Sequence, residues 1–267
     1  MLFLAGFAFQ IEPEASLTPA EGQALRTLAD SGSDRGQGAR PAFRVVLDRG
    51  TVRAAAPAAA RVSWTRDLCV LEHAAFRAEI DPFRKQARVF RGDASALGLV
   101  TTLRTALACW LPLEGGLVLH AAGLEHAGAG IAFFGPSGAG KTTLSGRSPW
   151  PVLSDELVAI VPGESASYRI RGTPFRKAPA GAATPGVEEP ALLALIELDK
   201  GPFSLTRHDP RTALRRLIAS AAVPAVPPVW SAALAVIGRL AREVPCYGMA
   251  WSLEEPPFAR LASALRL

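Results

Sequence analysis

Short apolar runs separated by turn residues fill the first third of the chain. They predict strands at residues 1–9, 43–47, 61–64, 68–71, 76–80 and 87–90. The last two runs flank Asp81 and Pro82, which is typical of a hairpin turn. Residues 19–28 show a weak helical period, and residues 30–38 are rich in Gly, Ser and Asp, which favours a loop. We therefore expect a β-rich N-terminal subdomain over residues 1–94, whose short strands indicate that it packs on the remaining chain.

A helical pattern follows this region. Apolar residues recur every four positions from Leu99 to Leu107 and predict a helix over residues 95–111, which Pro112 ends. Beyond it, strands are expected at residues 117–119, 131–134, 151–153, 157–161, 168–170 and 191–198, and helices at 211–220, capped by Asp209, and at 229–240. This alternation predicts an α/β domain over residues 95–267.

The composition narrows the class of protein. At 267 residues, with 49% hydrophobic and 20% charged residues, the chain can bury a full α/β core with a smaller subdomain. The net charge of +5 is spread along the chain, and no basic stripe with interleaved aromatic residues occurs, which argues against nucleic-acid binding. Diffuse positive charge suits a phosphate-rich ligand or an acidic partner, and an arginine-rich proteome explains it equally well.

The three cysteines, Cys69, Cys109 and Cys246, show neither metal-ligand spacing nor a disulfide framework, which is typical of a reducing cytoplasm. Residues 1–9 are apolar but lack a basic segment and a cleavage site, so we do not expect a signal peptide. The stretch is also too short to span a bilayer, so no membrane association is expected.

The strongest motif lies at residues 135–142. They read Gly-Pro-Ser-Gly-Ala-Gly-Lys-Thr and fill every fixed position of the phosphate-binding template G-x-x-x-x-G-K-[ST], between an expected strand and an expected helix. Glycines let successive N–H groups point inward and form an anion nest, Lys141 would reach the β- and γ-phosphates, and the Thr142 hydroxyl would bind Mg²⁺. The expected nucleotide-binding residues are Gly135, Pro136, Ser137, Gly138, Ala139, Gly140, Lys141, Thr142 and Thr143.

This interpretation has an alternative, because a glycine-rich turn of the same sequence could bind nothing. In addition, only the six residues 142–147 lie between Lys141 and Ser148-Pro149, so the helix after the loop is shorter than in common mononucleotide kinases. The sequence therefore indicates an unusual P-loop family.

Three further segments carry a resemblance to a known family. His120-Ala-Ala, the run Phe133-Phe-Gly-Pro-Ser-Gly-Ala-Gly-Lys-Thr-Thr and Leu153-Ser-Asp-Glu-Leu-Val resemble the catalytic domain of HPr(Ser) kinase/phosphorylase. Among HPr-kinase-like proteins, the chain resembles the small ones encoded beside peptide-modification genes, including lasso-peptide precursor kinases, more than it resembles HPr kinase itself. Gly172-Thr-Pro-Phe175 is similar to a Gly-Thr-Pro-aromatic segment of that group. The resemblance covers residues 95–255 and does not extend to residues 1–94.

This resemblance implies a P-loop core related to ATP-dependent phosphoenolpyruvate carboxykinase and MgATP-dependent phosphorylation of a serine hydroxyl. It implies that Asp155 is the catalytic base, that His120 is its partner and that Lys141 acts on the phosphates. The implied magnesium ligands are Thr142, Asp155 and Glu156. Glu156 stands where most HPr kinases have a second aspartate, and no match to their HPr-binding segment occurs, so HPr itself is not the expected acceptor.

The residues themselves leave alternatives open. Asp155 can be a metal ligand without a base role, and His120 can be a structural histidine. Arg176 and Lys177 can clamp a phosphate or lie on a solvated loop, and the role of Thr173 is open as well.

Three functions compete. The leading one is a cytoplasmic kinase that takes ATP and a peptide, protein or small hydroxyl compound as its partners. The others are a non-catalytic nucleotide-binding partner in a peptide-maturation system and a P-loop ATPase. Glu197 and Asp199 end an apolar strand without the guanine-specificity motif, which disfavours a GTPase. The sequence leaves assembly into a homo-oligomer open.

Overall fold

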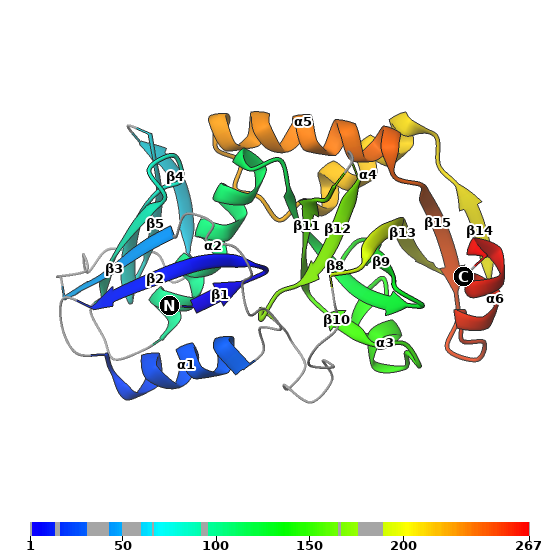
Figure 1. Cartoon of the computed structure of the whole chain (residues 1–267), viewed down its shortest axis with the longest axis horizontal. Helices are drawn as coiled ribbons and strands as arrows, with labels where there is room; N and C mark the ends of the chain where they lie inside the picture. Colours follow the sequence, from blue (N-terminus) through cyan, green and yellow to red (C-terminus); the bar gives the residue numbers. More distant parts are fainter. Residues whose placement is uncertain are drawn as a thin grey trace. The chain divides into compact units, whose positions relative to one another are not determined.

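The computed structural model describes residues 2–13, 17–30, 43–49, 60–65, 67–91, 96–164, 167–175 and 189–266. The chain forms a mixed α/β fold that divides into two compact units (Figure 1). Unit 1 comprises residues 1–114 and 223–230, and unit 2 comprises residues 115–222 and 231–267. The α/β class expected from the sequence is confirmed.

Unit 1 is built on a seven-stranded sheet with two helices. Its strand order is β1-β2-β3-β7-β6-β5-β4. The strands are β1 (Leu2–Leu4), β2 (Phe7–Pro13), β3 (Phe43–Arg49), β4 (Arg61–Thr65), β5 (Leu68–His73), β6 (Phe76–Asp81) and β7 (Gln86–Arg91), and the helices are α1 (Pro19–Asp30) and α2 (Leu97–Leu113). The hairpin expected around Asp81 and Pro82 is confirmed as β6–β7, and the Asp81 carboxylate accepts hydrogen bonds from two backbone N–H groups of the turn.

The expected single strand over residues 1–9 is wrong in one respect. The chain reverses at Ala5 and Gly6, where φ is +49° and +76°, and β1 pairs with β2 as an antiparallel hairpin. Two consecutive positive φ angles are typical of the two-residue turn that matches strand twist. The continuous apolar pattern hid this turn, since Ala5 is itself apolar.

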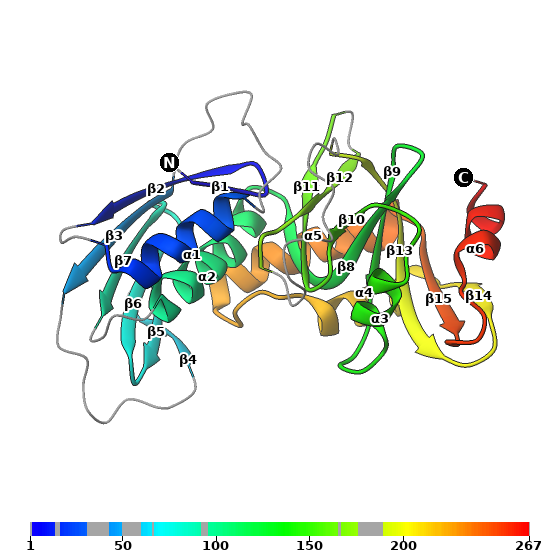
Figure 2. The same ribbon diagram turned by 90° about the horizontal axis from the view of Figure 1, so that it is seen from below.

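Helix α2 belongs to unit 1, which places the unit boundary at Glu114 rather than at residue 94. It packs on β6 and β7 (Figure 2). Trp110 is fully buried, with its ring centroid 4.9 Å from that of Phe7 and 5.5 Å from that of Phe43. Gly98 allows the close approach, because a Cβ there would lie 2.8 Å from the Cβ of Phe76. The helix therefore completes the core of this sheet.

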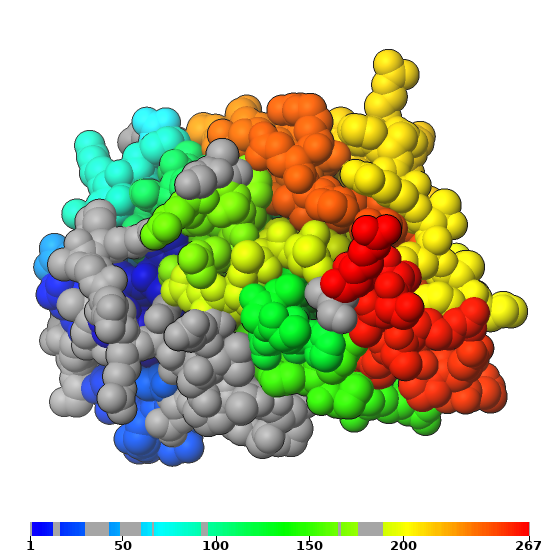
Figure 3. All heavy atoms as spheres, turned by 45° about the vertical axis from the view of Figure 1, so that its right-hand side comes forward, coloured from blue at the N-terminus to red at the C-terminus, as the bar shows by residue number. Residues whose placement is uncertain are grey.

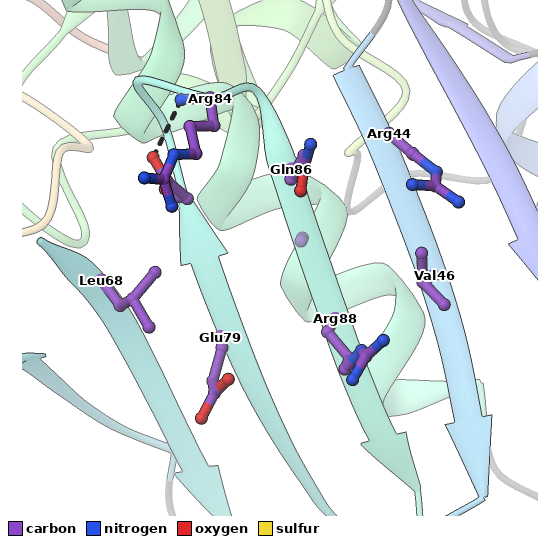
Figure 4. Close-up of a pocket in the computed structure, with 9 residues that line it drawn as sticks. Arg44, Val46, Leu68, Glu79, Arg84, Gln86 and Arg88 are labelled. Carbon is purple, nitrogen blue, oxygen red and sulfur yellow. Dashed lines mark hydrogen bonds and ion pairs between the residues drawn. The ribbon is translucent and has the colours of Figure 1, made fainter.

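The open face of the same sheet is polar. It bears a shallow cavity of about 300 Å³ between β3 and β5 (Figure 4). Arg44 at its rim is paired with Glu12 at 2.6 Å, and Arg84 lies 3.8 Å from Asp81. These arginines are half or more exposed, which is typical of a solvated sheet face.

Unit 2 contains a mixed sheet of eight strands. Its strands are β8 (Leu117–His126), β9 (Ala129–Phe134), β10 (Val152–Ser154), β11 (Leu157–Pro162), β12 (Tyr168–Gly172), β13 (Ala191–Lys200), β14 (Ser204–Arg207) and β15 (Cys246–Trp251). Its helices are α3 (Lys141–Gly146), α4 (Pro210–Ser220), α6 (Phe258–Leu265) and most of α5 (Pro227–Glu243). β14, β15 and α6 had no counterpart among the sequence predictions. The capping of α4 is confirmed, since the Asp209 carboxylate accepts from Thr212 and Arg211, which lowers the pKa of Asp209.

Strand pairing in unit 2 closes on itself. β9 lies between antiparallel β8 and parallel β13, and β13 is also parallel to β15. β8 pairs with β11, β11 with β12, and β12 returns to β13 through Arg169 and Ala191. Glycines permit this closure, because a Cβ on Gly130 would lie 2.1 Å from the Cγ2 of Ile170.

One face of this sheet is covered by α3 and α6. Phe133, Ile196 and Met249 on the sheet share a core with Leu144 of α3 and Leu261 of α6. Figure 3 shows the red surface of α6 beside the green surface of this part of the chain. The helix that follows the phosphate-binding motif is therefore fixed to the sheet through the core contacts of Leu144.

We predict that α2 decides whether unit 1 can fold. A fragment of residues 1–94 lacks Trp110 and should leave the apolar face of the sheet exposed, whereas a fragment of residues 1–114 restores that core. Thermal unfolding followed by circular dichroism should show a cooperative transition only for the longer fragment. A cooperative transition in the shorter fragment would contradict the assignment of α2 to the core of unit 1.

Candidate functional site

The phosphate-loop motif lies at the carboxyl end of β9. Buried Phe134 ends the strand, Gly135–Gly140 form the loop, and α3 begins at Lys141. The strand–loop–helix order expected from the sequence is confirmed, and so is the shortness of the helix, which has six residues. A helix of this length aligns few peptide dipoles, so the N–H groups of the loop must supply most of the attraction for an anion.

The three glycines of the loop all have positive φ angles. Gly135 has φ +143°, Gly138 has φ +81° and Gly140 has φ +99°. Residues with a Cβ rarely adopt these angles, and only glycine adopts them without strain. A Cβ on Gly140 would also lie 3.2 Å from the Trp251 ring, and one on Gly135 would lie 3.1 Å from the carbonyl oxygen of Leu198. The loop therefore packs directly on the ends of β13 and β15.

Lys141 is buried, with 7% of its surface exposed. Its Nζ donates hydrogen bonds to the carbonyl oxygens of Gly135 at 2.7 Å and Pro136 at 3.0 Å. These bonds hold the ammonium group at the start of the loop. Thr142 and Thr143 are exposed on the first turn of α3. A cation inside the loop and hydroxyls at its end are the groups that a bound triphosphate requires.

His120 lies in the interior of a strand. The strand expected over residues 117–119 is longer than predicted, because β8 includes His120 and continues for six residues beyond it, to His126. It pairs with Leu157 of β11 on one edge, while the next residue, Ala121, pairs with Phe134 of β9 on the other edge. Side chains alternate along a strand, so His120 lies on the same face as Ala122, which packs in the core with α3.

Asp155 and Glu156 join β10 to β11. Asp155 is 5% exposed and Glu156 is half-buried. The backbone N–H of Ala121 donates to the carbonyl oxygen of Glu156 at 3.0 Å. β8 is thus the single strand between the start of the phosphate loop and the Asp155 segment, which places their backbones ~10 Å apart at the usual strand spacing. Side chains of His120 and Asp155 can bridge a separation of this size.

Thr173 contacts the Asp155 segment from its other edge. Its hydroxyl donates to the carbonyl oxygen of Leu157 at 2.7 Å, and the Ser154 hydroxyl lies 3.5 Å from the carbonyl oxygen of Thr173. Both hydroxyl-bearing residues are buried. The sequence pointed to Thr173 only through the similarity of Gly172-Thr-Pro-Phe175 to a family segment, which left its role open and predicted no such contact. Arg176 and Lys177, the other candidates from that region, lie outside the described residues.

No cluster of three or more His, Cys, Asp or Glu side chains that could hold a metal occurs among the described residues. Mg²⁺ usually takes only one or two protein oxygens together with substrate phosphates and water, so a nucleotide-bound ion needs no such cluster. The Thr142 hydroxyl and the carboxylates of Asp155 and Glu156 are hard oxygen donors of the type Mg²⁺ prefers. Their chemistry fits the ion.

Asp199 is a further carboxylate at this end of the sheet. It follows the apolar residues of β13, and Leu198 before it contacts Gly135. P-loop NTPases hold Mg²⁺ through such a strand-end aspartate. In the sequence, Asp199 was noted only because the guanine-specificity motif is absent there, although an apolar run followed by an aspartate is also typical of such a strand end.

Two of the other histidines and the three cysteines lie in structural contacts away from these candidates. His208 Nε2 and Arg216 Nε each lie 3.3 Å from Glu197 Oε2, while the ring of His126 stacks on Trp150 with centroids 4.5 Å apart. All three cysteines are buried free thiols. Burial, reinforced by the charge of Glu197, raises the pKa of Cys246 to about 12, so this thiol is a poor nucleophile.

Two glycines allow a matched test of the phosphate loop. Gly138 in the loop and Gly128 in the β8–β9 turn have φ angles of +81° and +80°, and neither has an atom within 4 Å of an added Cβ. Each change to alanine should cost ~1–2 kcal/mol of stability for the left-handed backbone. Only Gly138→Ala should weaken MgATP binding, by about tenfold or more, the equivalent of ~1.4 kcal/mol.

Calorimetric titration with MgATP measures this difference, and thermal unfolding verifies that the two variants are equally destabilised. Equal affinities for MgATP in Gly138→Ala and Gly128→Ala would contradict a role of the loop N–H groups in phosphate binding.

A family model described as SynChlorMet cassette protein ScmC matches residues 96–177. This segment runs from α2 through the phosphate loop and Asp155 to the Gly-Thr-Pro segment. No curated protein matches the chain.

None of the helices in the described residues combines the length and hydrophobicity that crossing a bilayer requires.

Proposed function

We propose that the chain is a MgATP-dependent kinase that transfers a phosphoryl group to a hydroxyl of a peptide, a protein or a small molecule. One observation carries the proposal. β8 pairs with the strand that ends in the phosphate loop and with the segment that carries Asp155, and it places His120 between them. The P-loop core, its relation to HPr kinases and serine as the acceptor are parts of the same proposal and rest on the motif resemblance.

The proposed chemistry assigns a task to each group. The loop N–H groups and Lys141 bind the β- and γ-phosphates and neutralise charge as the bond between the γ-phosphorus and the bridging oxygen breaks. Asp155 accepts the proton of the acceptor hydroxyl as its oxygen bonds to the γ-phosphorus, and ADP leaves. A magnesium ion held by Thr142, Asp155 and Glu156 would neutralise further phosphate charge.

His120 is assigned to orient Asp155. A histidine beside a carboxylate favours the ionised form of that carboxylate and can hold its position by a hydrogen bond. His120 is half-buried, which limits the access of water to its side chain. The three buried free thiols accord with the cytoplasmic location that we propose.

A second candidate is a nucleotide-binding protein without transferase activity. The six-residue α3 favours it, because so short a helix contributes little to orienting a triphosphate for attack. An ATPase that releases phosphate to water is the third candidate.

Incubation with γ-labelled ATP, Mg²⁺ and hydroxyl-bearing peptides separates these functions. The kinase predicts label on a peptide hydroxyl, the binding protein predicts bound ATP without turnover, and the ATPase predicts labelled phosphate alone. Lys141→Ala serves as the control, because it removes the cation of the phosphate loop and should abolish turnover in either enzyme. Unchanged binding and turnover in this variant would contradict a functional phosphate loop.

Asp155→Asn tests the base. The amide keeps the size of the side chain but cannot accept the proton, so transfer should fall by roughly 10²-fold or more while ATP affinity changes little. Asp81→Asn, in the β6–β7 turn of unit 1, is the control and should leave both the transfer rate and the ATP affinity unchanged. If Asp155 is mainly a magnesium ligand, the change raises the Mg²⁺ requirement instead.

His120→Ala should lower the transfer rate less than Asp155→Asn does. The double variant should be little slower than Asp155→Asn alone, because residues that act as a unit lose their effects together. Steady-state kinetics of the four proteins provides the measurement. Additive losses would show that the two residues act independently, and wild-type rates in both single variants would refute the proposed catalytic pair.

A further inference from the structure

The segment that carries Asp155 is held at both edges. On one edge, Ala121 of β8 donates its N–H to the carbonyl oxygen of Glu156 at 3.0 Å. On the other edge, the carbonyl oxygen of Leu157 receives the Thr173 hydroxyl at 2.7 Å. Consecutive carbonyl groups of an extended segment point in opposite directions, so these two bonds oppose each other across the strand.

The second bond extends the contact between β11 and β12 by one residue. β12 pairs with β11 as far as Gly172, opposite Val158, so Thr173 follows the last paired residue of β12 and lies beside Leu157. The hydroxyl of Thr173 supplies a donor at this point. Leu157 is 1% exposed and Thr173 is 1% exposed, so water cannot substitute for the hydroxyl without local opening.

The end of β12 and the end of β10 approach each other so closely that a residue with a Cβ would not fit at Gly172. A Cβ on Gly172 would lie 2.2 Å from the carbonyl oxygen of Leu153, so the backbone before Thr173 presses on the residue before Ser154. The Ser154 hydroxyl adds a longer contact of 3.5 Å to the Thr173 carbonyl oxygen. Contacts from Gly172 and Thr173 therefore bracket Asp155 on both sides along the chain.

We propose that Thr173 is a positioning residue for Asp155, an inference that rests on the proposed kinase function. Its hydroxyl fixes the backbone at Leu157, two residues after the base, and so fixes the direction in which the Asp155 carboxylate meets the acceptor. Removal of the hydroxyl leaves the shape of the core intact and leaves a buried carbonyl oxygen without this donor. Such a change loosens the base without touching the nucleotide.

Thr173→Val is the direct test, since valine keeps the shape and lacks the hydroxyl. It should lower kcat for transfer by ~10- to 100-fold, the range expected for a misplaced catalytic group, with the KM for ATP nearly unchanged. Thr173→Ser keeps the hydroxyl and should restore most of kcat. In an Asp155→Asn background, Thr173→Val should add little, because its effect acts through Asp155.

Thr102→Val is the matched control. Thr102 is fully buried in unit 1, and its hydroxyl donates to the carbonyl oxygen of Gly98 at 2.6 Å. This variant should lose stability by a comparable amount and keep the wild-type kcat. If Thr173→Val keeps the wild-type kcat, or if its loss is equally large in the Asp155→Asn background, the positioning role is refuted.

Amide hydrogen exchange separates this inference from the kinase proposal. Thr173→Val should increase deuterium uptake in peptides that cover residues 155–157, and neither Thr173→Ser nor Thr102→Val should do so. Unchanged uptake in Thr173→Val refutes the inference even if the wild-type protein is an active kinase. Increased uptake in a protein that transfers no phosphate supports the hold on Asp155 and refutes the kinase proposal instead.

Discussion

The hydrogen-bonded pairing of β8 on both of its edges is the constraint on which the candidate site depends. Ala121 pairs with Phe134 at the start of the phosphate loop, and its N–H bonds to the carbonyl oxygen of Glu156 on the opposite side. A slip of one residue in either register would move His120 to the opposite face of the sheet and shift the loop away from Asp155. One strand thus sets the positions of all three groups.

Buried polar side chains mark the same place. Among the described residues of unit 2, six polar or charged side chains are buried, namely Lys141, Ser145, Ser154, Asp155, Thr173 and Ser220. Lys141 and Ser145 lie on α3, Ser154 at the end of β10 precedes Asp155, and Thr173 follows β12, which pairs with β11 after Asp155. Burial of a polar group costs free energy unless it is hydrogen-bonded, so a core would otherwise contain few of them. Their concentration on α3 and near Asp155 is the kind of polar cluster that a fold maintains at some cost in stability.

Local patterns in the sequence predicted much of this structure. The phosphate loop, the β6–β7 hairpin and the Asp209 cap follow from residues close together in the chain, where a motif or a turn residue is sufficient evidence.

β8 was predicted too short because Ala121-Ala122-Gly123 breaks its run of large apolar residues. These positions are small since a Cβ on Gly123 would lie 2.8 Å from Val158, a constraint that only the closed pairing reveals. The contact of Thr173 with Leu157 spans sixteen residues and is set by the same closure, so spacing alone could not show it. The unit boundary at Glu114 likewise depends on the packing of α2, which a strand count does not reveal.

A crystal structure with Mg²⁺ and a non-hydrolysable ATP analogue tests the central claim most directly, because it places the γ-phosphate relative to β8. We expect the β- and γ-phosphates to be bound by the N–H groups of residues 135–142, with the Asp155 carboxylate on the side of the γ-phosphate that faces away from the β-phosphate. The space between the carboxylate and the γ-phosphorus should admit an acceptor oxygen that lies ~3 Å from each of them. An analogue bound elsewhere, or a γ-phosphate that points away from His120 and Asp155, would contradict it.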